Sequence, residues 1–221
     1  MTGSRVTVSR SLITAMQAVQ DAVSVHPYAV SADLPRAALR RVLGKLRARL
    51  PDLERDRWHA SRRRAAGLPS HVLVIYWPKP GQTGWFVLLS SADDPAAGER
   101  WQDVRQRKTR LRIRAGWWEL VRHTAPGAKA PRWTWRMSAE RRAALIEQID
   151  EAAAKGWRDW LTRFAQQSRR WPGFAGIRAD HAAIGKHLTS RWMRTQRGEA
   201  PEWPRLPYVT RRARTPRRPG V

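Results

Sequence analysis

Arg110, Arg112 and Arg114 alternate with two apolar residues, and arginines at this spacing can bind a row of phosphates. Residues two apart on an extended strand share a face and lie about 7 Å apart, close to the spacing of phosphates along one nucleic-acid strand. A guanidinium group also binds phosphate in a bidentate manner that an ammonium group cannot copy. Arg132 and Arg136 alternate in the same way, and we expect them to extend the row if their strand pairs nearby. The alternative is an ordinary solvated sheet face.

The pair Trp117–Trp118 follows this row directly. Adjacent side chains of a strand point to opposite faces, so one of the two either faces the arginines or lies under a covering helix. An exposed Trp117 would stack on the bases of RNA or single-stranded DNA, whereas a covered one belongs to the core. The loop tryptophans Trp101, Trp171 and Trp203 are interpreted as local packing.

Further cations lie on two helices expected before residue 67 and in the C-terminal tail. Both helices carry many arginines, and the second has little apolar content, so we predict a phosphate-contacting surface rather than only a solvated face. The candidate residues are Arg40, Arg41, Arg62, Arg63 and Arg64 on the helices, and Arg211 and Arg212 in the tail.

The sequence supports binding better than catalysis. It contains no His-x-His pair, no Asp-x-Asp pair and no Gly-rich phosphate loop, so we expect neither a metal nor a cofactor. Asp93 and Asp94 lie in a Pro/Ala/Gly-rich loop and are interpreted as turn residues. A metal-independent endoribonuclease remains the enzymatic alternative, because the 2′-OH of RNA can act as the nucleophile. Its candidate base and acid are His59, Tyr76 and His123.

Composition indicates a polyanionic partner. The 221 residues include 43 Lys+Arg against 18 Asp+Glu, a formal net charge of +25. A compact protein with such an excess repels itself unless a polyanion compensates it. The chain has no cysteine, which excludes disulfide scaffolds and thiol nucleophiles and fits a reducing compartment. With no apolar leader and no long apolar run, we expect a protein of the bacterial cytoplasm without a membrane partner.

The pattern of apolar residues predicts an α+β fold, in which an antiparallel β-meander of about five strands is flanked by N-terminal and C-terminal helical segments. Residues 1–67 are expected to be helical and basic, with Asp33 capping the first of the two arginine-rich helices, the one that contains Arg40 and Arg41. Residues 68–137 are expected to form the sheet, and a helical turn is expected within residues 101–104 of its long loop.

The remaining chain is expected to divide into two parts. Residues 138–196 form a helical segment capped by Ser138, and residues 197–221 form a basic Pro/Arg-rich tail. Such a tail cannot bury enough apolar surface to fold alone, but it could order against phosphate or against the rest of the protein.

Two short segments carry a resemblance. The Trp-Thr-Trp-Arg strand (residues 133–136) and the Pro-Gly-Phe-Ala-Gly-Ile-Arg segment (residues 172–178) resemble proteins encoded on bacterial plasmids and integrative elements. CRISPR systems carried on plasmids also encode arginine-rich RNA-handling subunits of about this size. The glycine-rich C-terminal loop of the CRISPR endoribonucleases is absent from this sequence, which counts against that activity.

Together these observations predict a nucleic-acid-binding component, for RNA or single-stranded DNA, of a bacterial mobile-element or defence ribonucleoprotein complex that contains other protein subunits. One alternative is a metal-independent endoribonuclease that processes and retains a structured RNA of the CRISPR type. The other is a basic scaffold protein that docks on nucleic acid.

Overall fold

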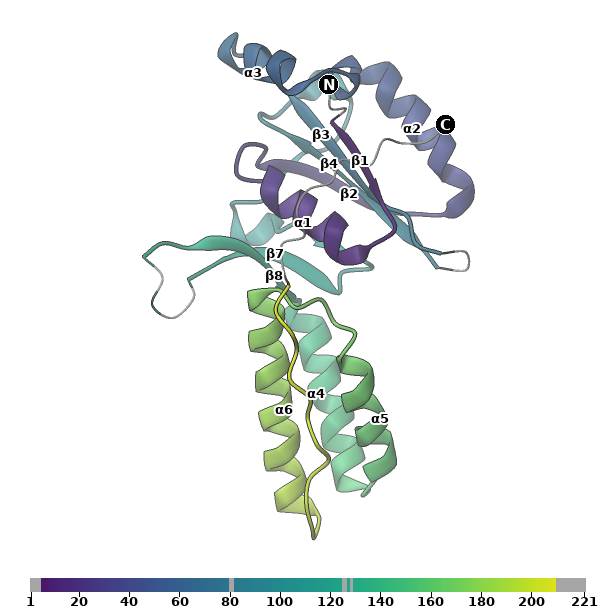
Figure 1. Cartoon of the computed structure of the whole chain (residues 1–221), viewed down its shortest axis with the longest axis vertical. Helices are drawn as coiled ribbons and strands as arrows, with labels where there is room; N and C mark the ends of the chain where they lie inside the picture. Colours follow the sequence, from purple (N-terminus) through teal and green to yellow (C-terminus); the bar gives the residue numbers. More distant parts are fainter. Residues whose placement is uncertain (1–4, 80–81, 125–126, 128, 210–221) are drawn as a thin grey trace. The chain divides into compact units, whose positions relative to one another are not determined.

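The computed structural model describes residues 5–79, 82–124, 127 and 129–209, and its fold is α+β (Figure 1). The chain divides into two compact units at the turn between Ala115 and Gly116. The described residues 5–115 are called the N-terminal unit, and residues 116–209 the C-terminal unit.

The N-terminal unit alternates strands and helices. Its strands are β1 (Val6–Ser9), β2 (Tyr28–Leu34), β3 (His71–Tyr76), β4 (Gly84–Ser90), β5 (Gln102–Asp103) and β6 (Arg112–Ile113). Its helices are α1 (Leu12–Ala22), α2 (Leu39–Arg49) and α3 (Arg57–Ala65), with 3₁₀ turns at Arg36–Ala38, Pro51–Glu54, Pro95–Ala97 and Arg107–Thr109.

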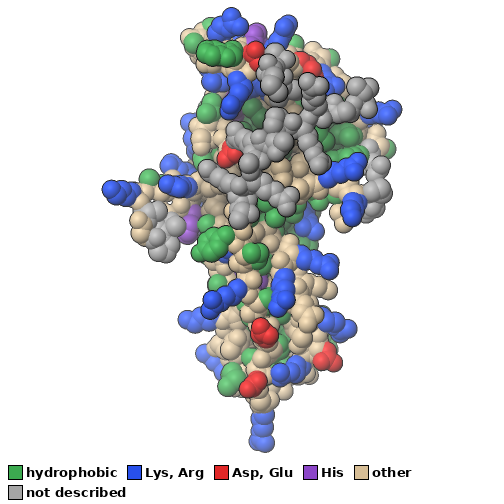
Figure 2. Space-filling view, in the orientation of Figure 1, with side chains coloured by type: hydrophobic (Ala, Val, Ile, Leu, Met, Phe, Trp, Pro, Cys, Tyr) green, Lys and Arg blue, Asp and Glu red, His purple; other side chains and the backbone are tan. Residues whose placement is uncertain are grey.

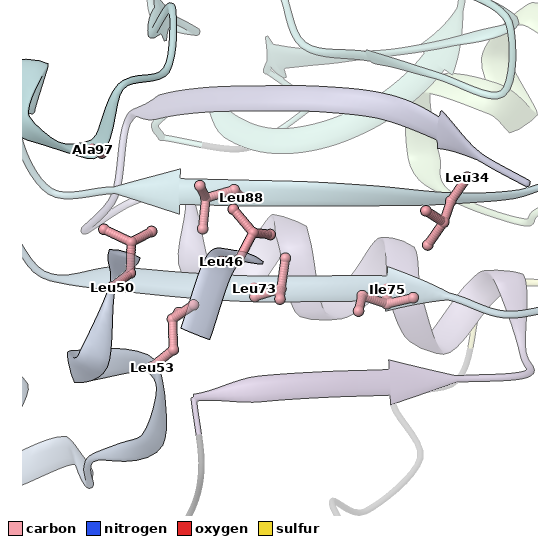
Figure 3. Packing of buried hydrophobic residues seen from close by; sticks show 8 residues of the cluster. All are labelled: Leu34, Leu46, Leu50, Leu53, Leu73, Ile75, Leu88 and Ala97. Carbon is pink, nitrogen blue, oxygen red and sulfur yellow. The ribbon is translucent and has the colours of Figure 1, made fainter. Parts of the chain in front are cut away.

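The main sheet is mixed, with five strands in the order β1-β3-β4-β2-β5. Strand β1 pairs with β3 in parallel, and β4 runs antiparallel to both β3 and β2, so β1, β2 and β3 share one direction. The chain therefore crosses over from β1 to β2 through α1 and returns from β2 to β3 through α2. Right-handed crossovers in opposite directions require helices on opposite faces of the sheet. Figure 3 shows α1 and α2 on opposite sides of the strands.

The core between the sheet and α2 is almost entirely leucine (Figure 3). Leu46 of α2 and Leu50, directly after the helix, pack against Leu73 and Leu88, which are direct partners across β3 and β4. With Leu39, Val42 and Leu43 they form the apolar stripe of the helix. On the other side of the sheet, α1 buries Met16 and Val19. Burying both faces explains why β3 and β4 read as continuous apolar runs.

Four predictions for this unit were wrong. Two strands, β1 and β2, lie in the range expected to be helical, and Asp33 lies within β2 instead of capping a helix. The parallel pairing of β1 with β3 also means that the sheet is not a pure meander. In the long loop, the helical turn falls at Pro95–Ala97, while Gln102–Asp103 forms a short strand. The hairpin of β3 and β4 is confirmed.

The C-terminal unit combines the hairpin of β7 (Trp118–His123) and β8 (Arg132–Met137) with three helices. The helices are α4 (Ala139–Ala154), α5 (Arg158–Ser168) and α6 (Ala175–Thr195). Within this unit, β7 and β8 pair antiparallel along their whole length, from Trp118 with Met137 to His123 with Arg132. Ser138 caps α4 as predicted, because its side chain accepts a hydrogen bond from the backbone N–H of Arg141. Helix α6 buries one face, which includes Ile177, Ile184, Leu188 and Trp192.

Residues 197–209 form an extended strap along the helices of the C-terminal unit (Figure 1). Its anchor is Trp203, whose indole N–H lies 3.1 Å from Nδ1 of His181 and 3.0 Å from the carbonyl oxygen of the same residue. The indole covers Gly185 of α6, where a Cβ would stand 2.1 Å from the ring. This part of the predicted tail is therefore ordered by burying Trp203 and Leu206 against the helices.

No helix within the described ranges is long and apolar enough to cross a membrane.

Candidate nucleic-acid interface

The outer faces of α2 and α3 carry a set of exposed cations, which we call the α2–α3 surface. Leucines hold α2 on the sheet through one face, so the charged residues of the helix must point outward. Arg40, Arg41 and Lys45 are all exposed on that outward side. Arg55, Arg57 and Arg62 are exposed in and just before α3. None of these six cations has a carboxylate within ion-pairing distance among the described residues. The six, together with Trp58 between them in sequence, make up the surface.

The acidic residues of the same segment are already used for structure. Asp52 is buried and bonded to the start of β3, and Glu54 forms an ion pair with Arg47 at 2.6 Å. Asp56 caps α3 by accepting a hydrogen bond from the backbone N–H of His59. The positive charge of the α2–α3 surface is therefore uncompensated locally, which raises the concentration of polyanions near it. In Figure 2, Lys and Arg side chains outnumber acidic ones on the visible face.

The three arginines at the end of α3 have different roles. The side chain of Arg63 donates to the carbonyl oxygen of Pro69 at 2.8 Å, and Arg64 donates to Oγ of Ser70 at 3.2 Å. Both arginines fasten the helix to the chain that enters β3. Arg62 is exposed, whereas Arg63 and Arg64 are half-buried. The sequence predicted all three as phosphate ligands, and Arg62 is the one of the three that is exposed and whose side chain makes no bond to another described residue.

Trp58 is the residue that sequence reasoning missed. Its side chain is 76% exposed, and on the helix it lies one turn before Arg62. The small residue Ala60 is the one that α3 buries. The signal was present in the sequence, since a tryptophan in a helix with almost no apolar stripe has no core to enter.

A buried polar network fixes the α2–α3 segment to the sheet. Asp52 accepts hydrogen bonds from the backbone N–H of His71 at 2.8 Å and from its Nδ1 at 2.9 Å. The second charge in the network is Arg5, which donates to Asp52 at 3.4 Å and to Nε2 of His26 at 2.7 Å. These bonds tie β1, the turn after α2 and β3 together, so the surface is carried on a rigid base.

Burial shifts the ionisation of this network. Burial, followed by the charge of Arg5, lowers the pKa of His26 to about 4, so the imidazole is neutral at pH 7. Burial also lowers the pKa of Arg5 to about 10, which leaves it charged. For Asp52, burial raises the pKa, but hydrogen bonds from His71 and the charge of Arg5 outweigh it, and the pKa lies below the usual value. The network therefore holds a charged pair and a neutral imidazole.

The predicted row of arginines on one long strand does not form. Strand β6 contains only Arg112 and Ile113, and Arg114 has a φ of +54°, which places it in a turn. Leu111 and Ile113 are buried as the alternation predicted, and Arg112 and Arg114 are exposed, but Arg110 is half-buried. A continuous strand is needed for the regular 7 Å spacing. The correction is that these arginines are not evenly spaced along one face.

The arginine face predicted for β8 is covered. Helix α6 crosses this face so closely that a Cβ on Gly176 would stand 2.6 Å from the backbone oxygen of Trp135. Arg136 forms an ion pair with Asp180 of α6 at 2.9 Å, so it is engaged inside the unit. Arg132 remains exposed at the start of the strand. The alternation of the sequence was right, but it could not show that a helix packs on the polar side.

The tryptophan pair is accounted for by packing. Trp118 is buried at the start of β7, where its ring meets Trp171 edge to face. Trp117 lies in the turn before the strand, and the guanidinium group of Arg141 sits 4.0 Å from its ring centroid. The predicted stacking platform is thus occupied from within the unit. Trp101, which stacks on His71, is used locally as expected, and so is Trp203.

The three candidate catalytic residues lie on three different elements. His59 lies in α3, and Tyr76 ends β3, about 17 Å from the start of that strand. His123 belongs to the C-terminal unit. Asp94 caps a 3₁₀ turn, as the turn interpretation predicted. No group of three or more potential metal ligands occurs among the described residues. Arg211 and Arg212 lie outside the described residues.

Comparisons of the chain with protein-family models, with curated proteins and with solved structures find no match.

Proposed function

We propose that this protein binds RNA or single-stranded DNA through the α2–α3 surface of its N-terminal unit. The observation that carries the proposal is the set of six exposed cations without carboxylate partners, on helices whose own acids are engaged in the fold. Arginine dominates the set, and its planar fork suits bidentate contact with phosphate. The formal net charge of +25 adds long-range attraction for a polyanion.

Like charges on the α2–α3 surface raise the free energy of the unbound protein. Six cations on two consecutive helices repel one another, and a polyanionic partner would relieve that repulsion. Each phosphate that is neutralised releases condensed counterions, so binding should weaken steeply with salt. The fold also holds these helices rigidly, through the leucine core under α2 and the Asp52 network, so little entropy is lost in positioning the cations.

The test is a salt series with labelled single-stranded RNA, single-stranded DNA and duplex DNA. Its key variant is Arg40→Ala/Arg41→Ala/Lys45→Ala. Removing three phosphate contacts should flatten the slope of log K against log salt by about 2 for a single strand and weaken binding by about tenfold or more at low salt.

The matched control removes the same charge from the other unit. Arg163, Arg169 and Arg170 are exposed in and just after α5, and their triple alanine variant should leave the salt slope nearly unchanged. If both triple variants lose affinity equally, binding depends only on net charge and the α2–α3 surface is not the site. A gel of the substrate after incubation with EDTA distinguishes plain binding from the endoribonuclease alternative, which requires cleavage.

A further inference from the structure

We propose that Trp58 is a base-stacking platform, so that the α2–α3 surface takes unpaired nucleotides in preference to a closed duplex. This inference rests on the proposed function, because it assigns the ligand class of the same surface. In this proposal Trp58 contacts the bases of the ligand, whereas the cations of the surface contact only its phosphates.

Trp58 is 76% exposed, a larger fraction than for any other tryptophan of the chain. The next most exposed, Trp157, is 48% exposed, and the ammonium group of Lys155 lies 4.6 Å from its ring centroid. The remaining tryptophans are buried or half-buried, and several of them contact histidine, another aromatic ring or an arginine side chain. The indole of Trp58 contributes little to the packing of α3, so its apolar surface is available to a ligand.

Trp58 lies between arginines on the surface of α3. One helical turn separates it from Arg62, and residues four apart on a helix are surface neighbours about 5–6 Å apart. Arg57 precedes the tryptophan directly, and both arginines are exposed. A base stacked on the indole would therefore have its phosphate within reach of a guanidinium group. Alternating aromatic and cationic groups are the arrangement by which proteins hold single strands.

An exposed indole beside cations is complementary to a single strand of nucleic acid. The bases of a closed duplex are already stacked on each other, so a duplex can use the cations but not the indole face without opening. An apolar protein surface would also cover the indole, but it would leave Arg57 and Arg62 without a counter-charge. A single strand satisfies both the ring and the cations.

The experiment compares Trp58→Ala and Trp58→Phe with Ser61→Ala, an exposed position on the same helix that serves as the control. The ligands are single-stranded RNA and DNA of about 12 nucleotides, which lies within the usual site size. Each carries one 2-aminopurine, whose fluorescence is quenched by stacking, and a duplex of the same sequence is measured in parallel. Circular dichroism confirms that the variants remain folded.

We expect Trp58→Ala to weaken single-strand binding about 5- to 100-fold and to abolish most of the quenching, while Trp58→Phe retains both largely. Duplex binding and the salt slope should be unchanged in either variant. If Trp58→Ala binds single strands as tightly as the unaltered protein, with a steep salt slope, the platform is wrong and the proposed function stands. An equal loss for single strands and duplex also overturns the platform. If the unaltered protein binds none of these ligands, it is the proposed function that fails.

Discussion

The two units of this protein illustrate two different uses of arginine. In the N-terminal unit, four arginines of α2 and α3 are exposed and have no carboxylate partner among the described residues, namely Arg40, Arg41, Arg57 and Arg62. In the C-terminal unit, four other arginines are part of the packing: Arg136 and Arg142 bind Asp180, Arg141 covers Trp117, and Arg178 lies 3.4 Å from the ring centroid of Tyr208. The comparison teaches that an arginine-rich composition does not by itself locate a binding surface, because guanidinium groups also serve as planar packing groups.

Each unit also contains one buried aspartate that binds both a backbone N–H and arginine, so the two aspartates can be compared directly. Asp52 and Asp180 each bind a backbone N–H at the end of a strand, that of His71 and that of Met137, and each also binds arginine. The surroundings differ. The Arg5 side chain that faces Asp52 is 6% exposed, whereas the Arg136 and Arg142 side chains that face Asp180 are 32% and 37% exposed.

The largest expected effect on the free energy of unfolding comes from replacing these two carboxylates by amides. Asp52→Asn should destabilise the N-terminal unit by about 3 kcal/mol or more, because it leaves Arg5 charged and buried. Asp180→Asn should cost the C-terminal unit only about 1–2 kcal/mol, because water can solvate its arginines. Hydrogen exchange of peptides that contain β3 and β8 measures the two units separately. Equal losses in the two units would contradict the claim that burial of the arginine makes the difference.

Acid should weaken both units through one histidine in each. Burial lowers the pKa of His181 to about 4, and the pKa of His26 is lowered to about 4 as well, against 6.5 when unfolded. Between these values the unfolded chain binds the extra proton, so stability is lost as the pH falls from 6.5 towards 4. Each histidine should cost its unit roughly 2 kcal/mol by pH 5.

Urea denaturation at pH 7 and pH 5, followed by hydrogen exchange in each unit, checks this dependence. His26→Gln should remove part of the acid sensitivity of the N-terminal unit alone, and His181→Gln that of the C-terminal unit alone. If either variant altered both units equally, the titration would not be local.

Two helical glycines differ in their surroundings: one lies on a packed helix face and the other on an open one. Gly185→Ala should destabilise the C-terminal unit by about 2 kcal/mol, because the new Cβ would stand 2.1 Å from Trp203. Gly44→Ala on α2 should instead stabilise the N-terminal unit by about 0.5–1 kcal/mol, because nothing lies within 4 Å and alanine favours the helix.

Thermal unfolding with Trp203→Ala as a second change provides the control. In that background Gly185→Ala should lose most of its cost, since the clash has been removed. A cost that persists without the indole would show that the strap does not pack on Gly185.

The smallest effect distinguishes a packing arginine from a surface one. Arg141→Ala should cost about 0.5–1 kcal/mol, because it uncovers the ring of Trp117. Arg41→Ala should change stability by less than about 0.5 kcal/mol, because the side chain is exposed and unpaired. The same two variants should reverse their order in nucleic-acid binding. Urea midpoints and a binding titration test both halves of this statement.

Local patterns were enough for the elements whose partners are close in sequence. The apolar stripes of α2, α4 and α6, the cap at Ser138 and the hairpin of β3 and β4 could all be read directly, since each depends on residues a few positions apart. The net positive charge and the basic character of α2 and α3 were equally plain. Trp58 could also have been found, since its helix offers no apolar stripe for it to join.

The tertiary structure decided which faces are open. Strands β1 and β2 were missed because they are stabilised by β3 and β4, which lie far away in the chain, and short segments carry too little pattern to show such pairing. The polar side of β8 is closed by α6, so Arg136 meets Asp180 rather than solvent. The sequence by itself determined how much charge this protein carries and which helices hold it. Only packing between distant segments decided which arginines contact other parts of the fold and which remain accessible to a ligand. The reason is that a guanidinium group binds a carboxylate, an aromatic ring or a phosphate through the same surface.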